Sequence, residues 1–114
     1  MKVFSRRGLN PEEVSEGIEI TSYEDLFNCD AMFFCVAISS FEEVLKKSKE
    51  LLKKDTLYFD TCSVKVNPVK WMQANLPYGA RIIATHPMFG PDSYFESSEP
   101  LSMVMSNINT DEIE

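Results

Sequence analysis

An uninterrupted apolar run, AMFFCVAI at residues 31–38, constrains the fold of this chain more than any other feature. The run is far shorter than the roughly 20 residues that a helix needs to cross a bilayer. It is typical of a central strand in a parallel sheet that is covered on both faces. We therefore predict a buried strand over residues 31–38 at the centre of the core.

Short apolar runs alternate with helical patterns along the rest of the chain. Strands are expected at residues 2–5, 18–20, 57–60, 81–85 and 102–105, and helices at residues 10–17, 22–27 and 67–75. Asn10 and Ser22 are placed as N-caps of the first two helices. This alternation predicts βαβ units, and hence an α/β fold with a mainly parallel sheet.

The helix that follows residue 38 has the clearest pattern. Its expected buried face carries Phe41, Val44, Leu45, Ser48 and Leu52. Ser39 and Ser40, with the glutamates that follow them at residues 42 and 43, have the spacing of a capping box. We therefore predict an amphipathic helix that packs directly on the strand before it.

Length and charge exclude several classes of protein. The chain has 114 residues, enough for one ordinary domain, which we expect over residues 1–106 with an acidic tail over 107–114. Its net charge of -7 disfavours nucleic acid or an anionic membrane as a partner, so any anion must be held by a local basic cluster. With no membrane-length run and no leader pattern, we expect a cytoplasmic protein. The three cysteines lack paired spacing, so we expect reduced thiols and no zinc site.

Polar segments follow the expected strands at their carboxyl ends. They are SRRG at residues 5–8, VAISS at 36–40, DTCSVK at 60–65 and THPMFGPDS at 85–93. In open parallel sheets ligands bind at this edge, near the point where strand order reverses. We therefore expect these segments to line one site.

The first of these segments supplies cationic groups. A dinucleotide-binding fold places an acidic residue here for the ribose hydroxyl of NAD, or a basic one for the 2'-phosphate of NADP. Ser5, Arg6 and Arg7 instead offer a hydroxyl and two guanidiniums, which suit a phosphate dianion. The alternative is a solvated pair of arginines near the terminus.

Ser63 and His86 are the candidate catalytic side chains. His86 is the only histidine of the chain, it ends an expected strand, and the loop from Pro87 to Pro91 that follows it is stiff. An imidazole held in this way can serve as a general base. The competing interpretations are a packed or surface histidine, and Ser63 and Asp60 that merely cap the turn into the next helix.

Taken in order, FSRR, CVAISS, DTCSVK and THPMFGPDS resemble the nucleotide-binding domain of prephenate and arogenate dehydrogenases, especially the NADP-using arogenate type. The resemblance implies an oxidative decarboxylation in tyrosine biosynthesis. His86 would take the proton of the substrate hydroxyl, and Ser63 would hydrogen-bond both that hydroxyl and the histidine. It further implies NADP as cofactor, bound by residues at the strand ends. These are Ser5, Arg6, Arg7, Val36, Ala37, Ile38 and Ser63.

The chain also departs from that family. It contains no glycine-rich turn for a pyrophosphate and no helical second domain, so we expect an incomplete Rossmann-type, doubly wound sheet that lacks its first βα unit. Residues 2–5 and 31–38 then lose the strand between them, and open apolar edges favour association. We expect a homo-oligomer with little activity as an isolated chain.

Two rival interpretations remain. One is a non-catalytic nucleotide-binding or interaction domain that retains only the fold. The other is a different dehydrogenase on the same fold, against which the HPMFGP segment argues.

Overall fold

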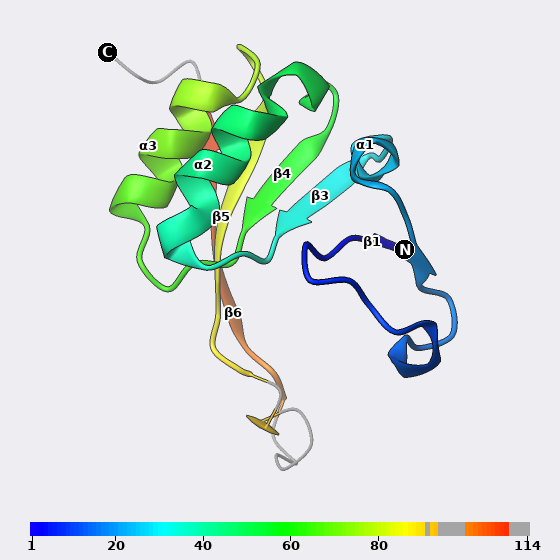
Figure 1. The fold of residues 1–114 in the computed structure, drawn as a ribbon. Coiled ribbons are helices and arrows are strands. Elements are labelled where there is room, and N and C mark those ends of the chain that lie inside the picture. Colours follow the sequence, from blue (N-terminus) through cyan, green and yellow to red (C-terminus); the bar gives the residue numbers. More distant parts are fainter. Residues whose placement is uncertain (91, 94–99, 110–114) are drawn as a thin grey trace.

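The computed structural model describes residues 1–90, 92–93 and 100–109 (Figure 1). The strands are β1 Lys2–Val3, β2 Glu19–Ile20, β3 Ala31–Phe34, β4 Leu57–Asp60, β5 Arg81–Pro87 and β6 Met103–Asn109. The α-helices are α1 Tyr23–Leu26, α2 Ile38–Ser48 and α3 Val66–Asn75, and short 3-10 helices span Pro11–Glu13 and Lys49–Leu51. The predicted alternation of strands and helices is confirmed.

The strands form two separate sheets. The larger has four strands in the order β3-β4-β5-β6. Strands β3, β4 and β5 are parallel, and β6 runs antiparallel to β5. The smaller sheet pairs β1 with β2 in parallel. The architecture is therefore the expected mainly parallel, Rossmann-like α/β fold.

A break in the strand order lies between β1 and β3. The two strands do not pair, and within the described residues the outer edge of β3 has no strand partner. The sequence led us to expect that these two strands would either close up or be paired by another chain. They do not close up, so the backbone of β3 keeps an open edge.

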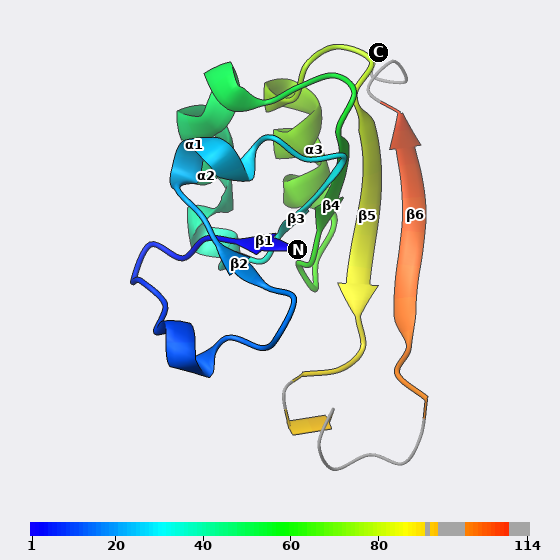
Figure 2. The same cartoon turned by 90° about the vertical axis from the view of Figure 1, so that its right-hand side faces the viewer.

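The core lies between the larger sheet and helices α2 and α3. Figure 2 shows both helices on the same side of the sheet. From α2, the side chains of Phe41, Leu45 and Ser48 are fully buried, as predicted. Phe41 and Leu45 belong to one core cluster with Phe34 and Tyr58 from the strands. Burial of these apolar side chains is the main force that holds helices and sheet together.

The opposite face of the sheet is open, which corrects the expectation that residues 31–38 are covered on both faces. Burial alternates along β3, so that Met32 and Phe34 are buried whereas Phe33 is 54% exposed. Phe33 stacks on Phe59 of β4, with ring centroids 4.3 Å apart. No helix of the described chain covers this face, and β3 therefore behaves as a strand with one buried side.

The sequence placed several element ends wrongly. β3 stops at Phe34, and α2 already begins at Ile38 with Ala37 as N-cap and no side-chain cap, so the predicted capping box is absent. An apolar run cannot by itself distinguish a strand from the first turn of a buried helix, and Ile38 belongs to the latter. β6 runs to Asn109 and is longer than predicted. The N-caps at Asn10 and Ser22 are confirmed.

Aromatic contacts attach the small sheet to the larger unit. The ring of Phe4, just after β1, lies 5.2 Å from that of Tyr23 in α1. The Tyr23 hydroxyl hydrogen-bonds Ser48 Oγ in α2, and Lys47 Nζ lies 5.5 Å from the Tyr23 ring centroid. Phe4, Tyr23 and α2 therefore fix the start of the segment that carries the two arginines.

Candidate functional site

The two candidate catalytic residues belong to neighbouring strand ends, since Ser63 lies in the turn after β4 and His86 is the penultimate residue of β5, paired with Val104 of β6. In the register of β4 and β5, Asp60 pairs with Ala84, which is the last pair of that ladder. Ser63 lies three residues beyond Asp60, and His86 two residues beyond Ala84. The sheet therefore brings both residues to the same edge, the carboxyl ends of its parallel strands, as the sequence predicted.

Neither residue is fully buried. Ser63 is exposed in the turn after β4, and His86 is half-buried near the end of β5. No hydrogen bond joins the two residues in the described part of the chain. The hydrogen bond that the family resemblance implies between them is therefore not formed here.

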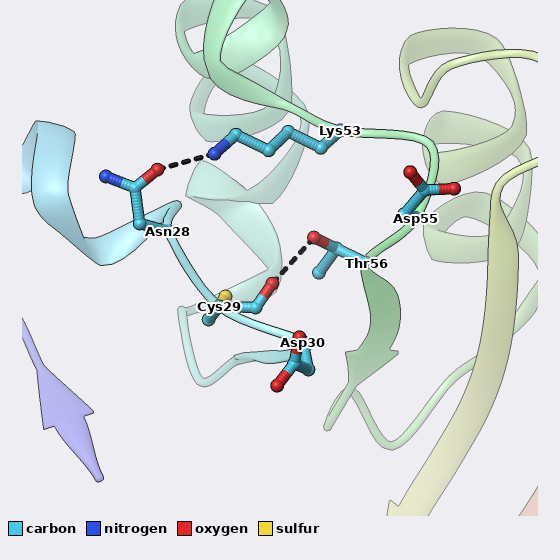
Figure 3. Close-up of a pocket in the computed structure, with 6 residues that line it drawn as sticks. All are labelled: Asn28, Cys29, Asp30, Lys53, Asp55 and Thr56. Atoms are coloured by element: carbon cyan, nitrogen blue, oxygen red, sulfur yellow. Dashed lines mark hydrogen bonds between the residues drawn. The ribbon is translucent and has the colours of Figure 1, made fainter.

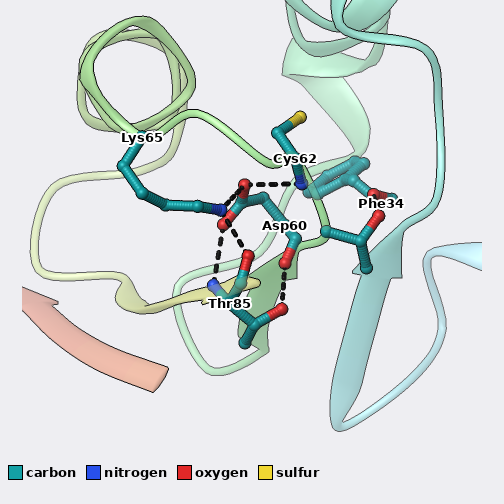
Figure 4. A network of polar contacts seen from close by, with 6 residues as sticks. Phe34, Asp60, Cys62, Lys65 and Thr85 are labelled. Carbon is teal, nitrogen blue, oxygen red and sulfur yellow. Dashed lines mark hydrogen bonds and ion pairs between the residues drawn. The ribbon is translucent and has the colours of Figure 1, made fainter. Parts of the chain in front are cut away.

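A buried carboxylate lies at the same end of the sheet, where Figure 4 shows it among Cys62, Lys65 and Thr85. Asp60 is fully buried at the end of β4. Its Oδ2 accepts hydrogen bonds from the backbone N–H of Cys62, at 3.1 Å, and from Lys65 Nζ, while its Oδ1 accepts from the N–H of Thr85, at 3.0 Å. Lys65 Nζ also donates to the carbonyl of Thr85. A charge that is buried in this way needs such partners, and Asp60 has them on both sides.

Two hydroxyl groups extend this network across three strands. Thr85 Oγ1 donates to the carbonyl oxygen of Asp60, and Thr61 Oγ1 donates to the carbonyl of Phe34 at 3.1 Å. The carboxyl ends of β3, β4 and β5 are thereby tied together. Beyond the last backbone pair of β4 and β5, side-chain hydrogen bonds therefore connect the strand ends that carry Ser63 and His86.

The same environment suppresses the reactivity of a thiol. Burial, and to a lesser degree the negative charge of Asp60, raise the pKa of Cys62 above its ordinary value. Cys62 is therefore a packed, protonated side chain and not a nucleophile. Each of the cysteines is free, as predicted.

The loop after His86 is only partly described. Pro87 still pairs with Met103 of β6, and the N–H of Met88 donates to the carbonyl of Ser102 at 2.9 Å. These contacts anchor the chain immediately after His86. Pro91, the second proline of the stiff loop, lies outside the described residues.

The other predicted cofactor residues form two turns. Val36 and Ala37 lie between β3 and α2, Ile38 is the first residue of α2, and Ala37 and Ile38 are exposed. Ser5 begins a turn that closes with a 3.0 Å hydrogen bond from the N–H of Gly8 to the Ser5 carbonyl. A glycine suits this position, because its φ of 80° is in the left-handed region.

The two arginines lie at the centre of that turn. Arg6 and Arg7 are both exposed, and neither guanidinium has an ion-pair partner within the described ranges. They follow β1 of the small sheet, whereas Ser63 and His86 belong to the ends of β4 and β5 in the larger one. Their fork-shaped donors are free to bind a phosphate group.

A hollow of about 400 Å³ lies at the other end of the larger sheet (Figure 3). Its lining residues are Asn28, Cys29, Asp30, Lys53, Asp55 and Thr56. They precede β3 and β4, so the hollow is at the amino ends of the strands, away from Ser63 and His86. Lys53 already hydrogen-bonds Asn28, and we assign no chemistry to this hollow.

Comparison with known proteins gives the family. The sequence profile of the family described as "Prephenate dehydrogenase, nucleotide-binding domain" matches residues 11–101, which include Ser63 and His86. The chain belongs to this family. Arg6 and Arg7 lie before the matched range, so the family match alone does not cover them.

Individual relatives agree with the family match. Chloroplastic arogenate dehydrogenase 1 of Arabidopsis thaliana is 33% identical over 109 residues, which cover 92% of this chain and 17% of the relative. Chloroplastic arogenate dehydrogenase 2 of the same plant is 36% identical over 80 residues, covering 69% of this chain and 22% of the relative. The chain therefore spans about a fifth of the length of these relatives.

A solved structure confirms the fold. Prephenate dehydrogenase from Aquifex aeolicus superimposes with a TM-score of 0.53 at 24% identity, covering 64% of this chain and 26% of that chain. At this identity the likeness supports the Rossmann-like architecture alone. None of the described helices is long and apolar enough to cross a membrane.

Sequence reasoning recognised the exposed residues of the site but not their support. The sequence predicts Asp60 as a turn cap and gives no role to Lys65 or Thr85, which lie in the segments at residues 60–65 and 85–93. A buried acid at a strand end, five residues before a lysine, is the signal that was available. Its partner Thr85 depends on strand register, which a single sequence does not give.

Proposed function

We propose that this chain is the nucleotide-binding part of an NADP-dependent prephenate or arogenate dehydrogenase, which carries out an oxidative decarboxylation in tyrosine biosynthesis. The observation that carries the proposal is the position of Ser63 and His86 at neighbouring strand ends in a chain of this family. In parallel sheets this edge is where ligands bind.

The chain's own residues have two tasks in this reaction. His86 accepts the proton of the substrate hydroxyl as a general base. Ser63 is exposed in the turn after the neighbouring strand β4. It hydrogen-bonds the same hydroxyl and so orients it. Bound NADP+ supplies the hydride acceptor, and loss of carbon dioxide then leaves an aromatic ring.

The cofactor contacts are assigned to the turns around the same edge. Arg6 and Arg7 have free guanidiniums that suit the 2'-phosphate of NADP, and Ser5 adds a hydroxyl. Val36, Ala37 and Ile38, together with Ser63, lie where a nucleotide would cross the carboxyl ends of β3 and β4. The free arginines favour NADP over NAD, because NAD has no phosphate at that position.

Isothermal titration with NADP+ and NAD+ tests this assignment. Arg6→Ala should weaken NADP+ binding by roughly tenfold, as expected for one lost charge-assisted contact, and leave NAD+ binding unchanged. Arg81→Ala is the matched control, because Arg81 is an exposed arginine at the amino end of β5. Absence of any binding by the unaltered chain would contradict the proposal and favour a non-catalytic domain that retains only the fold.

The proposal includes a homo-oligomer, a small-molecule substrate and low turnover by the isolated chain. The open edge of β3 and the exposed Phe33 beside it support association between copies. The chain spans about a fifth of the length of the two plant relatives. The cytoplasmic location predicted from the sequence stays a proposal, and both plant relatives are named chloroplastic.

A further inference from the structure

The ion pair of Asp60 with Lys65, close in sequence to Ser63, has no role in the chemistry described so far. Asp60 is fully buried, whereas the side chain of Lys65 is 32% exposed. A buried ion pair is weak evidence for stability, because the cost of desolvating both charges offsets much of their attraction. Its presence at this edge therefore needs another reason.

That reason lies in the backbone groups that the pair holds. Beyond the pair of Asp60 with Ala84, no residue of β4 remains to pair with β5. The N–H of Thr85 nevertheless donates to Asp60 Oδ1 at 3.0 Å, and its carbonyl accepts from Lys65 Nζ. The two side chains thus hold the backbone of Thr85 at the point where the β4–β5 ladder ends. Buried backbone groups require such partners.

The carbonyl of Thr85 belongs to the peptide bond that leads into His86. With both its N–H and its carbonyl held, Thr85 fixes the direction in which the chain enters His86. The other carboxylate oxygen, Asp60 Oδ2, accepts hydrogen bonds from the backbone N–H of Cys62, at 3.1 Å, and from Lys65 Nζ. Cys62 and Lys65 lie before and after Ser63 in the turn that follows β4. One carboxylate therefore holds the backbone on both sides of the candidate site.

We propose that Asp60, Lys65 and Thr85 form a positioning clamp, which fixes Ser63 and His86 relative to each other. The clamp does not touch substrate, so its members are positioning residues and not catalytic ones. The importance of the clamp for turnover rests on the proposed function, but its existence can be tested without turnover. A base displaced by about 1 Å can lose on the order of a hundredfold in rate.

The single histidine makes a direct test possible, because the imidazole gives one set of NMR signals in the whole chain. Lys65→Met removes the cation while keeping most of the length of the side chain. We expect the His86 imidazole signals to shift and broaden, and the amide protons of Thr85 and Cys62 to exchange roughly 10- to 100-fold faster, as expected for weakened hydrogen bonds to a charged group. Lys65→Arg should restore most of the slow exchange.

Asp60→Asn provides a second variant at the same point. Its amide directs an NH2 group at a site where the backbone and Lys65 offer only donors, so the same His86 and Thr85 signals should change. If this variant fails to fold, Lys65→Met still decides the question, because Lys65 is partly exposed.

Tyr58→Phe is the control for a merely structural role. It removes hydrogen bonds to Lys53 at the opposite end of β4 and should leave the His86 signals in place. Unchanged His86 signals and unchanged Thr85 exchange in folded Lys65→Met would overturn the clamp. So would an equal disturbance of His86 by Tyr58→Phe.

The clamp and the proposed function can fail separately. Shifted His86 signals in the clamp variants, together with no binding of NADP+ by the unaltered chain, would support the clamp and contradict the function. Binding of NADP+ with no effect of Lys65→Met would support the function and overturn the clamp.

Discussion

At the scale of single residues, buried polar groups in this protein are matched with particular partners. Tyr58 is 1% exposed, yet its hydroxyl accepts from the N–H of Lys53 at 2.6 Å and donates to the Lys53 carbonyl at 2.7 Å. Asp60, two residues further along β4, is satisfied in the same way. The two residues secure opposite ends of a short central strand.

Tyr58→Phe should therefore destabilise the fold. The variant removes the hydroxyl and leaves the backbone groups of Lys53 without that partner, which should lower the free energy of unfolding by about 1–3 kcal/mol. Urea denaturation followed by circular dichroism measures the change. An unaltered unfolding midpoint would show that the two hydrogen bonds contribute nothing net.

Stability should also fall in alkali. Burial raises the pKa of Tyr58 and of the Cys29 and Cys62 thiols. The folded chain thus keeps protons that the unfolded chain releases, so the stability from these groups is complete below about pH 8.5 and is lost as pH rises through the raised values. Urea denaturation at pH 7.5 and 9.5 tests this, and Cys62→Ala should show a smaller difference between the two pH values. Greater stability at the higher pH would contradict the assignment.

At the scale of elements, the sequence predicted which segments are strands and helices better than where they end. β4 was predicted with its observed bounds, and the buried face of α2 was predicted from its periodicity. The start of α2 was wrong, because the apolar run continues from β3 through the turn into the helix. The clamp was missed for a different reason, since it joins Asp60 to a residue 25 positions away.

The two faces of the sheet should respond differently to the same substitution. Phe41 is fully buried against the helix-covered face, and Phe33 is 54% exposed on the open one. Phe41→Ala should lower the free energy of unfolding by about 3–5 kcal/mol, whereas Phe33→Ala should cost well under half of that. Chemical denaturation of both variants compares them directly. Equal losses would mean that the open face is covered in solution.

At the scale of the whole molecule, the strand order contains one interruption. The carboxyl ends of β3, β4 and β5 were placed correctly from the sequence because parallel strands share an edge. An apolar run does not reveal which helices or strands cover its two faces and edges. For this reason β3 was expected to be buried on both sides. β1 and β3 belong to separate sheets, at the position where the sequence predicted that the strand between them is lacking.

The open edge and face of β3 should make the chain self-associate. Sedimentation at increasing concentration should show a dimer or larger species, and Phe33→Lys should reduce it, because charged side chains protect sheet edges. Phe33 is exposed enough for the lysine to be tolerated in the monomer. A chain that stays monomeric at high concentration would contradict the predicted association.

The central claim is that the carboxyl ends of β4 and β5 form a nicotinamide nucleotide site around Ser63 and His86. Titration of the chain with NADP+, followed through the His86 imidazole and the Ser63 amide by NMR, tests it most directly. The account predicts saturable shifts of both signals, with those of residues lining the hollow at the amino ends of β3 and β4 unchanged. Saturable shifts confined to that hollow, or no shift of His86 at millimolar NADP+, would contradict it.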